Sequence, residues 1–164
     1  MLTTTHNEGA VRILRFNRPE ALNAFSDAMF DAVAEDLLAA AEDDSVKVLI
    51  ITGEGRAFSA GMDLSDRPGK GSQPVHGFAG MFEAFIEFPK PILLAINGLG
   101  VGFGCTITGL ADLVFMAESA KLRCPFTALG LTAEAASTVT FPAMMGPQNA
   151  NWVLLSSEWL DAHT

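Results

Sequence analysis

The sequence predicts a single α/β domain in which buried strands lead through small-residue turns into helices. Two short apolar runs, at residues 46–52 and 91–97, have the composition of strands that are covered on both faces. Each run is followed by a segment of small residues, at 57–63 and at 98–104, and each segment is followed by a helical pattern. The same plan therefore occurs twice, which predicts an internal repeat built from strands, turns and helices.

The N-terminal elements can be assigned from side-chain periodicity. Residues 11–17 alternate apolar with basic or polar side chains and stop at Pro19, which predicts a half-buried strand at the edge of a sheet. Ser26 can cap a helix, because apolar side chains follow it at spacings of three and four, at Met29, Phe30, Val33, Leu37 and Leu38. The run at 46–52 is the first buried strand, and Gly53 ends it.

The remaining elements follow in the same way. Residues 57–63 are expected to form a loop, and residues 65–80 are expected to form a mobile surface loop because they are rich in Pro, Gly, Ser and Asp. A short helix at 81–88 then leads to the second buried strand and to the glycine-rich stretch 98–104. The last predicted elements are strands at 113–117 and 121–124 and helices around 138–145 and 149–155.

Composition excludes several classes of function. A chain of 164 residues with 49% apolar side chains can bury one substantial core but not two ordinary domains. Its formal charge of −9 would repel a phosphate backbone, so nucleic acid is not an expected partner. The two cysteines show no metal-ligand spacing, and no apolar run is long enough to span a membrane. We expect a cytoplasmic protein with no membrane partner.

The glycine-rich segment Gly98 to Gly104 follows a strand and precedes a helix, which is also the setting of a dinucleotide-binding turn. Its glycines stand at every second position, which is not the G-x-G-x-x-G spacing, and no acid follows at the usual distance. Such a segment can instead bring backbone N–H groups close to a developing oxyanion. The alternative is that the small residues only allow a helix to pack tightly against a sheet.

The chain resembles the enoyl-CoA hydratase/isomerase (crotonase) family at residues 18–24, 57–64 and 90–104, which occur in the family's order. The resemblance covers nearly the whole chain and implies a crotonase-like (ClpP/crotonase) fold of repeated strand-strand-helix units. It also implies that the backbone N–H groups of Met62 and Phe103 form an oxyanion hole for an acyl-coenzyme A thioester. Further substrate-binding positions then fall at Ala21, Ser59, Ala60, Gly61, Asp63, Leu64 and Gly102.

The resemblance further identifies a candidate base. Hydratases of the family use two glutamates, and the corresponding positions here are Thr106 and Phe126, neither of which can act as an acid or base. Moving a double bond requires only one proton-transferring group. Glu134 stands in an apolar segment that looks like the one containing the proton-shuttling glutamate of Δ3,Δ2-enoyl-CoA isomerases. Without the resemblance, Glu134 could simply be an acid that favours a helix N-terminus.

The predicted function is therefore that of an enoyl-CoA isomerase that needs no metal or redox cofactor, with coenzyme A present only as part of the substrate. One alternative is another crotonase enzyme, a hydratase or a thioesterase, which would need Glu83 or Glu87 in the pocket. The other is a non-catalytic acyl-CoA-binding protein, in which Glu134 would turn to solvent. We expect one core domain over residues 1–164 without the family's C-terminal helices, and a homotrimer or hexamer for a full-length chain.

Overall fold

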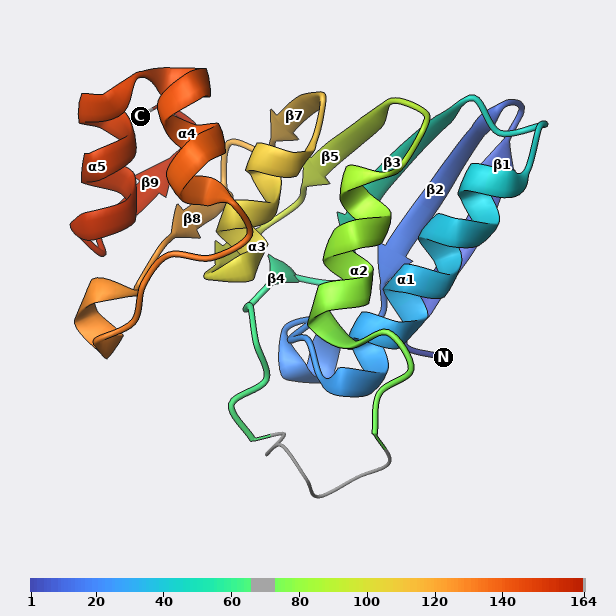
Figure 1. The fold of residues 1–164 in the computed structure, drawn as a ribbon, viewed down its shortest axis with the longest axis horizontal. Coiled ribbons are helices and arrows are strands. Elements are labelled where there is room, and N and C mark those ends of the chain that lie inside the picture. The colour runs from blue at the N-terminus through green and yellow to red at the C-terminus, as the bar shows by residue number, and fades with distance from the viewer. Residues whose placement is uncertain (66–72, 164) are drawn as a thin grey trace.

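The computed structural model describes residues 1–65 and 73–163 and shows two sheets with helices packed against them (Figure 1). The larger sheet has five strands in the order β1-β2-β3-β5-β7. Its strands are β1 (Thr3–Glu8), β2 (Val11–Phe16), β3 (Val48–Gly53), β5 (Ile92–Ile96) and β7 (Leu113–Met116). All neighbouring pairs are parallel except β1 and β2, which form an antiparallel hairpin.

The position of β2 corrects one prediction. The alternating pattern at 11–17 was expected to mark an edge strand, but β2 lies between β1 and β3. The edge is occupied by β1, whose side chains are polar and mostly exposed. A strand of this kind buries no apolar face, so its sequence carries no periodic signal.

The smaller sheet has the order β4-β6-β8-β9, from β4 (Ala57–Ser59), β6 (Leu99–Val101), β8 (Lys121–Arg123) and β9 (Trp159–Asp161). Each of β4, β6 and β8 directly follows a strand of the larger sheet, which confirms the repeated strand-strand-helix plan. The segments at 57–63 and 98–104 were predicted as loops and turns, but each contains a strand of three residues. Strands this short show no alternation that could be detected in the sequence.

Helices α1 (Asp27–Glu42) and α2 (Gly77–Ile86) lie side by side on one face of the larger sheet (Figure 1). Ser26 caps α1 as predicted, because its hydroxyl accepts the N–H of Met29 at 3.2 Å. Helix α2 begins earlier than the predicted 81–88. The carboxylate of Asp31 accepts the N–H groups of His76 and Gly77 at 2.7 and 2.8 Å and thereby fixes the start of this helix.

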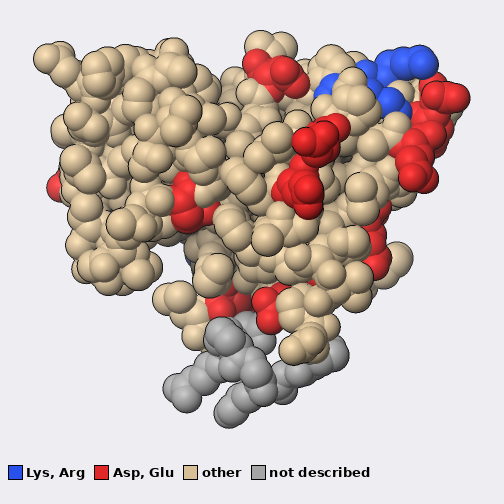
Figure 2. All heavy atoms as spheres, in the orientation of Figure 1, with Lys and Arg blue, Asp and Glu red and all other residues tan. Residues whose placement is uncertain are grey.

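The C-terminal half adds α3 (Phe103–Thr106), α4 (Ser137–Met145) and α5 (Pro147–Leu155). One 3-10 turn, Ile107–Leu110, directly follows α3, and another, Thr127–Leu129, lies between β8 and α4. Helices α4 and α5 close a second apolar cluster with α3 and β8. From 124 to 157 the sequence contains one charged residue, Glu134. In Figure 2 the part of the surface formed by α4 and α5 is correspondingly almost free of charge, whereas acidic side chains gather over α1 and α2.

Two further predictions concern segments outside these elements. The predicted surface loop at 65–80 is partly corrected, since its last residues belong to α2, and residues 66–72 lie outside the described part of the chain. No helix in 1–65 or 73–163 is long and apolar enough to cross a membrane. The segment after α5 forms β9, which pairs antiparallel with β8.

Asn23 provides a test of what holds the first turn in place. Its side chain is fully buried, accepts the N–H of Arg18 at 2.8 Å, and donates to the carbonyls of Glu54 and Ala57 at 2.9 and 2.8 Å. Asn23→Ala would remove these three hydrogen bonds from a buried position, so we expect a loss of roughly 2–4 kcal/mol in the free energy of unfolding. Urea denaturation measures this loss. Asn149→Ala, at an exposed position, is the matched control, and an equal effect of both changes would contradict the prediction.

Candidate functional site

Two small-residue segments that are far apart in the sequence meet at one place. Strands β4 and β6 pair in parallel, so the residues that follow them leave the small sheet together. A methyl group added at Gly61 would lie 2.5 Å from the carbonyl oxygen of Val101 and 3.5 Å from the nitrogen of Phe103. A methyl group at Gly104 would lie 2.3 Å from the carbonyl oxygen of Ser59. Only residues without a side chain allow the two backbones to approach this closely.

Two backbone N–H groups at this contact have no acceptor in the described part of the chain. Phe25 forms the two hydrogen bonds of a parallel bridge: its N–H donates to the Gly61 carbonyl and its carbonyl accepts the Asp63 N–H, each at 2.8 Å. Met62 lies between Gly61 and Asp63, and its own N–H makes no hydrogen bond to Phe25. Phe103 is the first residue of α3, where an N–H has no partner within the helix. The two predicted oxyanion donors therefore belong to segments in close contact, and neither N–H has an acceptor among the described residues.

Glu134 lies next to these groups. The hydroxyl of Thr106, the last residue of α3, donates to Oε1 of Glu134 at 2.5 Å. Thr106 follows Phe103 by three residues, which along a helix corresponds to a rise of about 4.5 Å. The other carboxylate oxygen, Oε2, is buried and has no hydrogen-bond partner among the described residues. The single carboxylate predicted as a base thus stands within one helical turn of the Phe103 N–H.

The surroundings of Glu134 shift its titration. Burial raises the pKa of Glu134 above its ordinary value, and the hydrogen bond from Thr106 opposes this effect only in part. The backbone that presents Glu134 is also strained, because Ala135 and Ala136 both have positive φ, 52° and 54°. Ser137 offsets this strain by donating its N–H and its hydroxyl to the Glu134 carbonyl, at 3.1 and 2.6 Å. Strained backbone beside a buried acid is typical of functional sites.

The predicted substrate-binding positions fall into two groups. Ser59 is fully buried, donates to the Asn23 carbonyl at 2.9 Å and accepts the Gly61 N–H at 3.1 Å, so its side chain fixes the segment from within. Ala60 donates its N–H to the Leu22 carbonyl at 2.9 Å. The positions that remain at least partly open to solvent are Ala21, Ala60, Asp63, Leu64 and Gly102.

Asp63 is occupied by contacts within the chain. One carboxylate oxygen accepts the hydroxyl and N–H of Ser65 at 2.6 and 3.0 Å, and the other pairs with Arg18 at 3.0 Å. The Ser65 hydroxyl, the Ser65 N–H and the Arg18 guanidinium together hold the pKa of Asp63 below its usual value. These are the bonds of a carboxylate that stabilises a local turn, and the substrate-binding role of Asp63 stays a prediction.

The two residues that supply the free N–H groups have very different side chains. Met62 is 57% exposed, so its thioether stands at the surface beside the site. Phe103 is only 4% exposed, and its ring packs edge-on against Phe25 and Phe78, with centroids 5.1 and 5.6 Å apart. The Phe103 ring therefore anchors the start of α3 to the core, rather than lying free at the surface.

Two basic side chains within the segments that resemble the family are engaged inside the chain. Arg18 pairs with Asp63, and Lys90 donates to the carbonyls of Ala40 and Asp43 at 2.7 Å each. Arg56 and Lys121 instead line a hollow of about 400 Å³ together with Leu22, Asn97, Gly98, Leu99 and Ser119. This hollow borders Leu22, the neighbour of Ala21. No sequence signal joined Arg56 to Lys121, because the pairing of β4, β6 and β8 brings them together.

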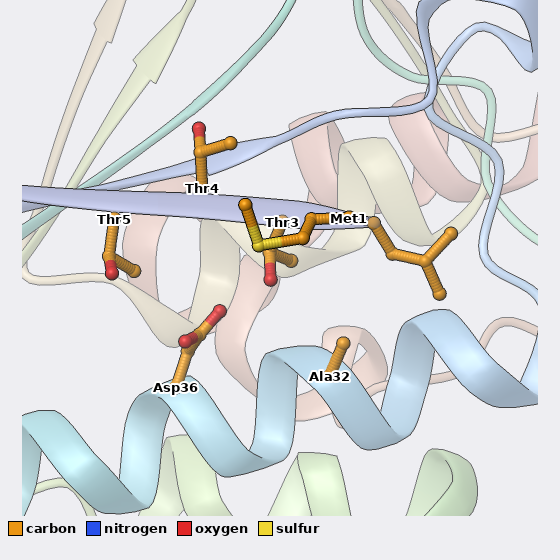
Figure 3. A pocket seen from close by; sticks show the side chains of 7 residues that line it. Met1, Thr3, Thr4, Thr5, Ala32 and Asp36 are labelled. Atoms are coloured by element: carbon orange, nitrogen blue, oxygen red, sulfur yellow. The ribbon is translucent and has the colours of Figure 1, made fainter.

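A second hollow, of about 370 Å³, lies between β1 and α1 and contains none of the predicted site residues (Figure 3). The figure shows Asp36 reaching from α1 toward Thr3 and Thr5 on the strand. Burial raises the pKa of Asp36, and its Oδ2 lacks a partner among the described residues. Apart from Asp36 the side chains that line this hollow are apolar or threonine, so no basic side chain lines it.

The carboxylates that an alternative mechanism would need are not in the pocket. Glu83 and Glu87 are exposed on or directly after α2. Phe126, at the second glutamate position of hydratases, is 7% exposed and belongs to the second apolar cluster. Within 1–65 and 73–163, no three His, Cys, Asp or Glu side chains are grouped so that they could hold a metal ion. Glu134, by contrast, contacts Thr106 at the end of the helix that Phe103 begins.

Known proteins match this chain over nearly its whole length. The family described as enoyl-CoA hydratase/isomerase matches residues 6–163. Human enoyl-CoA delta isomerase 2 is 34% identical over 98% of this chain, and 1,2-epoxyphenylacetyl-CoA isomerase of Escherichia coli is 35% identical over 96%. The chain spans 42% and 63% of these two relatives. A crystal structure described as an enoyl-CoA hydratase from Mycobacterium marinum is 49% identical, with a TM-score of 0.94, over 99% of this chain and 78% of that one.

The contact at Gly61 can be tested against a second glycine of similar conformation. Gly61 and Gly130 have φ of +82° and +68°, but only the space beside Gly61 is filled by backbone. Gly61→Ala adds a clash to the conformational cost that both changes share, so we expect it to destabilise the chain by roughly 1–3 kcal/mol more than Gly130→Ala. Thermal and urea denaturation measure this difference. Equal losses would show that the two segments are not in close contact.

The raised pKa of Glu134 predicts a pH-dependent gain in stability for Glu134→Gln. Since protonation of Glu134 favours the folded state, the wild type loses stability as the pH rises from the ordinary value of 4.5 through the raised one. Gln does not titrate, so the Tm of the variant should exceed that of the wild type by an amount that grows over this range and then levels off. Glu83→Gln, on the exposed face of α2, is the control for removal of one carboxylate. A flat difference for Glu134→Gln would contradict the prediction.

Proposed function

Since the chain belongs to the enoyl-CoA hydratase/isomerase (crotonase) family, we propose that it acts as an enoyl-CoA isomerase that converts a 3-enoyl-CoA thioester into the 2-enoyl isomer. In the proposed reaction the Glu134 carboxylate removes a proton from carbon 2 of the substrate. The electron pair moves into the thioester, and the resulting negative charge collects on the carbonyl oxygen. Glu134 then returns the proton to carbon 4, so the double bond ends between carbons 2 and 3.

The backbone N–H groups of Met62 and Phe103 stabilise the charged oxygen in this proposal. Both groups lack an acceptor in the described chain, and both belong to segments that the Gly61 contact holds together. Fixed donors need no reorganisation when the charge develops, and each donor of this kind contributes roughly 3 kcal/mol to the transition state. The substrate-binding roles of Ala21, Ala60, Asp63, Leu64 and Gly102 remain predictions of the same proposal.

The state of Glu134 is the observation that carries the proposal. One of its oxygens is held by Thr106, and the other is buried without a partner. An acid that served only to favour a helix N-terminus, or one turned to solvent as in a binding protein, would not be presented in this way. Burial also raises the pKa of Glu134 toward the range in which a carboxylate can both take and return a proton.

A hydratase is the main rival, because the Mycobacterium marinum structure is described as one. Hydration needs one group to activate water and usually another to manage the proton arriving at carbon. Thr106 and Phe126 stand at the two glutamate positions and supply neither group, which favours isomerisation. The arrangement of Arg56 and Lys121 beside Leu22 supports binding of an anionic ligand such as the coenzyme A portion of a thioester. The trimer or hexamer that the resemblance implies stays a prediction.

The proposed activity is tested by turnover of a 3-enoyl-CoA, with hydration of a 2-enoyl-CoA measured in parallel. Wild type should produce the 2-enoyl isomer, and Glu134→Gln should lose at least about a hundredfold in kcat, the scale of a general base. Glu83→Gln is the matched control, because it removes an exposed carboxylate from α2 and should leave kcat unchanged.

Two results would overturn this assignment. Hydration faster than isomerisation, with the same dependence on Glu134, would establish a hydratase in place of an isomerase. Binding of acyl-CoA by wild type and Glu134→Gln without turnover by either would establish a binding role instead. Isothermal titration with a saturated acyl-CoA supplies the binding measurement and separates a protein that cannot bind from one that cannot react.

A further inference from the structure

Thr106 makes a contact that its sequence position did not predict. It stands where hydratases of the family have a glutamate, and its side chain is fully buried. Its hydroxyl lies 2.5 Å from Oε1 of Glu134 and 3.3 Å from the carbonyl oxygen of Gly102. A hydroxyl has one proton to donate, and the much shorter distance assigns that proton to the carboxylate.

We propose that Thr106 is a positioning residue, whose hydroxyl holds Oε1 of Glu134 so that Oε2 alone transfers the substrate proton. This inference rests on the proposed isomerase function and deepens it. A free carboxylate can rotate and present either oxygen, and each rotation changes the distance and angle to the substrate carbon. A hydrogen bond from a buried hydroxyl fixes one oxygen, and the partnerless oxygen is then the one left for the proton.

The same bond can persist through both halves of the reaction. When Oε2 accepts the proton, Oε1 still has lone pairs that accept the Thr106 hydroxyl, so nothing in the contact must break before the proton is returned. The bond is stronger to the charged carboxylate than to the neutral acid, and it therefore counteracts the effect of burial on the Glu134 pKa. Thr106 should thus set both the orientation of the base and the pH at which it becomes active.

Among the described residues, the Cys105 thiol interacts electrostatically with Glu134, and Cys105 in turn contacts the Cys124 thiol. Cys105 precedes Thr106 in α3, and Cys124 follows β8; both are buried. Contact with the Cys124 thiol, together with burial, raises the pKa of Cys105 well above its ordinary value, so this thiol is neutral where Glu134 titrates. A neutral thiol does not change charge in that range. A pH shift caused by a change at Thr106 is therefore to be assigned to Glu134.

Three variants of the whole chain test the proposal. Thr106→Val keeps the shape of the side chain but removes the hydroxyl, and Thr106→Ser keeps the hydroxyl. Thr108→Val is the matched control, because Thr108 is also a buried threonine close to α3, and its hydroxyl donates to the Cys105 carbonyl at 2.8 Å instead of to Glu134. Each variant is measured by the pH profile of isomerisation and by 13C NMR titration of labelled Glu carboxyls, with the Glu134 signal identified by its loss in Glu134→Gln.

For Thr106→Val we expect the Glu134 titration and the acidic limb of the kcat profile to move to higher pH. We also expect kcat on the plateau to fall roughly tenfold or more, as for loss of a hydrogen bond to a charged group, while KM changes by less than about twofold. Thr106→Ser should restore both properties to near the wild-type values. Thr108→Val should move neither of them, although its Tm can fall.

The proposal is wrong if the Glu134 titration of Thr106→Val coincides with those of wild type and Thr108→Val, or if Thr106→Ser fails to restore it. This NMR measurement does not depend on turnover. If no isomerisation is found in the wild type, the proposed function fails, and a shifted Glu134 signal in Thr106→Val still shows that Thr106 controls this carboxylate. If the wild type isomerises the substrate but Thr106→Val and Thr106→Ser do not differ in the Glu134 titration or the kcat profile, the isomerase function stands and the proposed role of Thr106 is wrong.

Discussion

The close contact between the backbone after β4 and the backbone after β6 is the constraint on which the site depends. Gly61 and Gly104 allow the two segments to approach to distances that a single methyl group would prevent. Asn23 and Ser59 hold the first segment through buried hydrogen bonds, and the ring of Phe103 holds the second against the core. Two N–H groups without acceptors can stay side by side only in a scaffold this rigid, since each could otherwise find a partner by local rearrangement.

Glu134 places an energetic cost at the centre of the same scaffold. A partly buried carboxylate with one oxygen lacking a partner is unfavourable when charged, and Ala135 and Ala136 add strain in the backbone beside it. Folding tolerates this arrangement because Thr106 and Ser137 offset part of the cost through direct hydrogen bonds to Glu134. Burial makes the charged form of Glu134 unfavourable in the folded protein, and for the same reason the carboxylate readily accepts a proton. Burial therefore accounts both for the loss of stability and for the proposed function.

Family membership and chemistry are determined by different parts of the chain. The segments that identify the family, around Gly61 and Gly104, build the backbone contact that any member needs to bind a thioester oxygen. In the proposed function the reaction is decided by three other side chains, Thr106, Phe126 and Glu134. Replacing two carboxylate positions by a hydroxyl and a phenyl ring removes the acid–base pair that hydration needs, and it leaves one carboxylate for proton transfer.

The sequence by itself determined the elements with clear periodicity or composition, such as α1 with its Ser26 cap and the buried strands β3 and β5, and through motif order it determined the family. It did not reveal β1 or the three-residue strands β4 and β6. Nor did it reveal that Arg56 and Lys121 line the same hollow. Tertiary structure alone decided that Thr106 contacts Glu134, that Arg18 and Lys90 are occupied, and that the Phe103 ring points into the core. The physical reason is that periodicity reports which face of an element is buried, whereas these contacts join residues from different elements, and only packing brings them together.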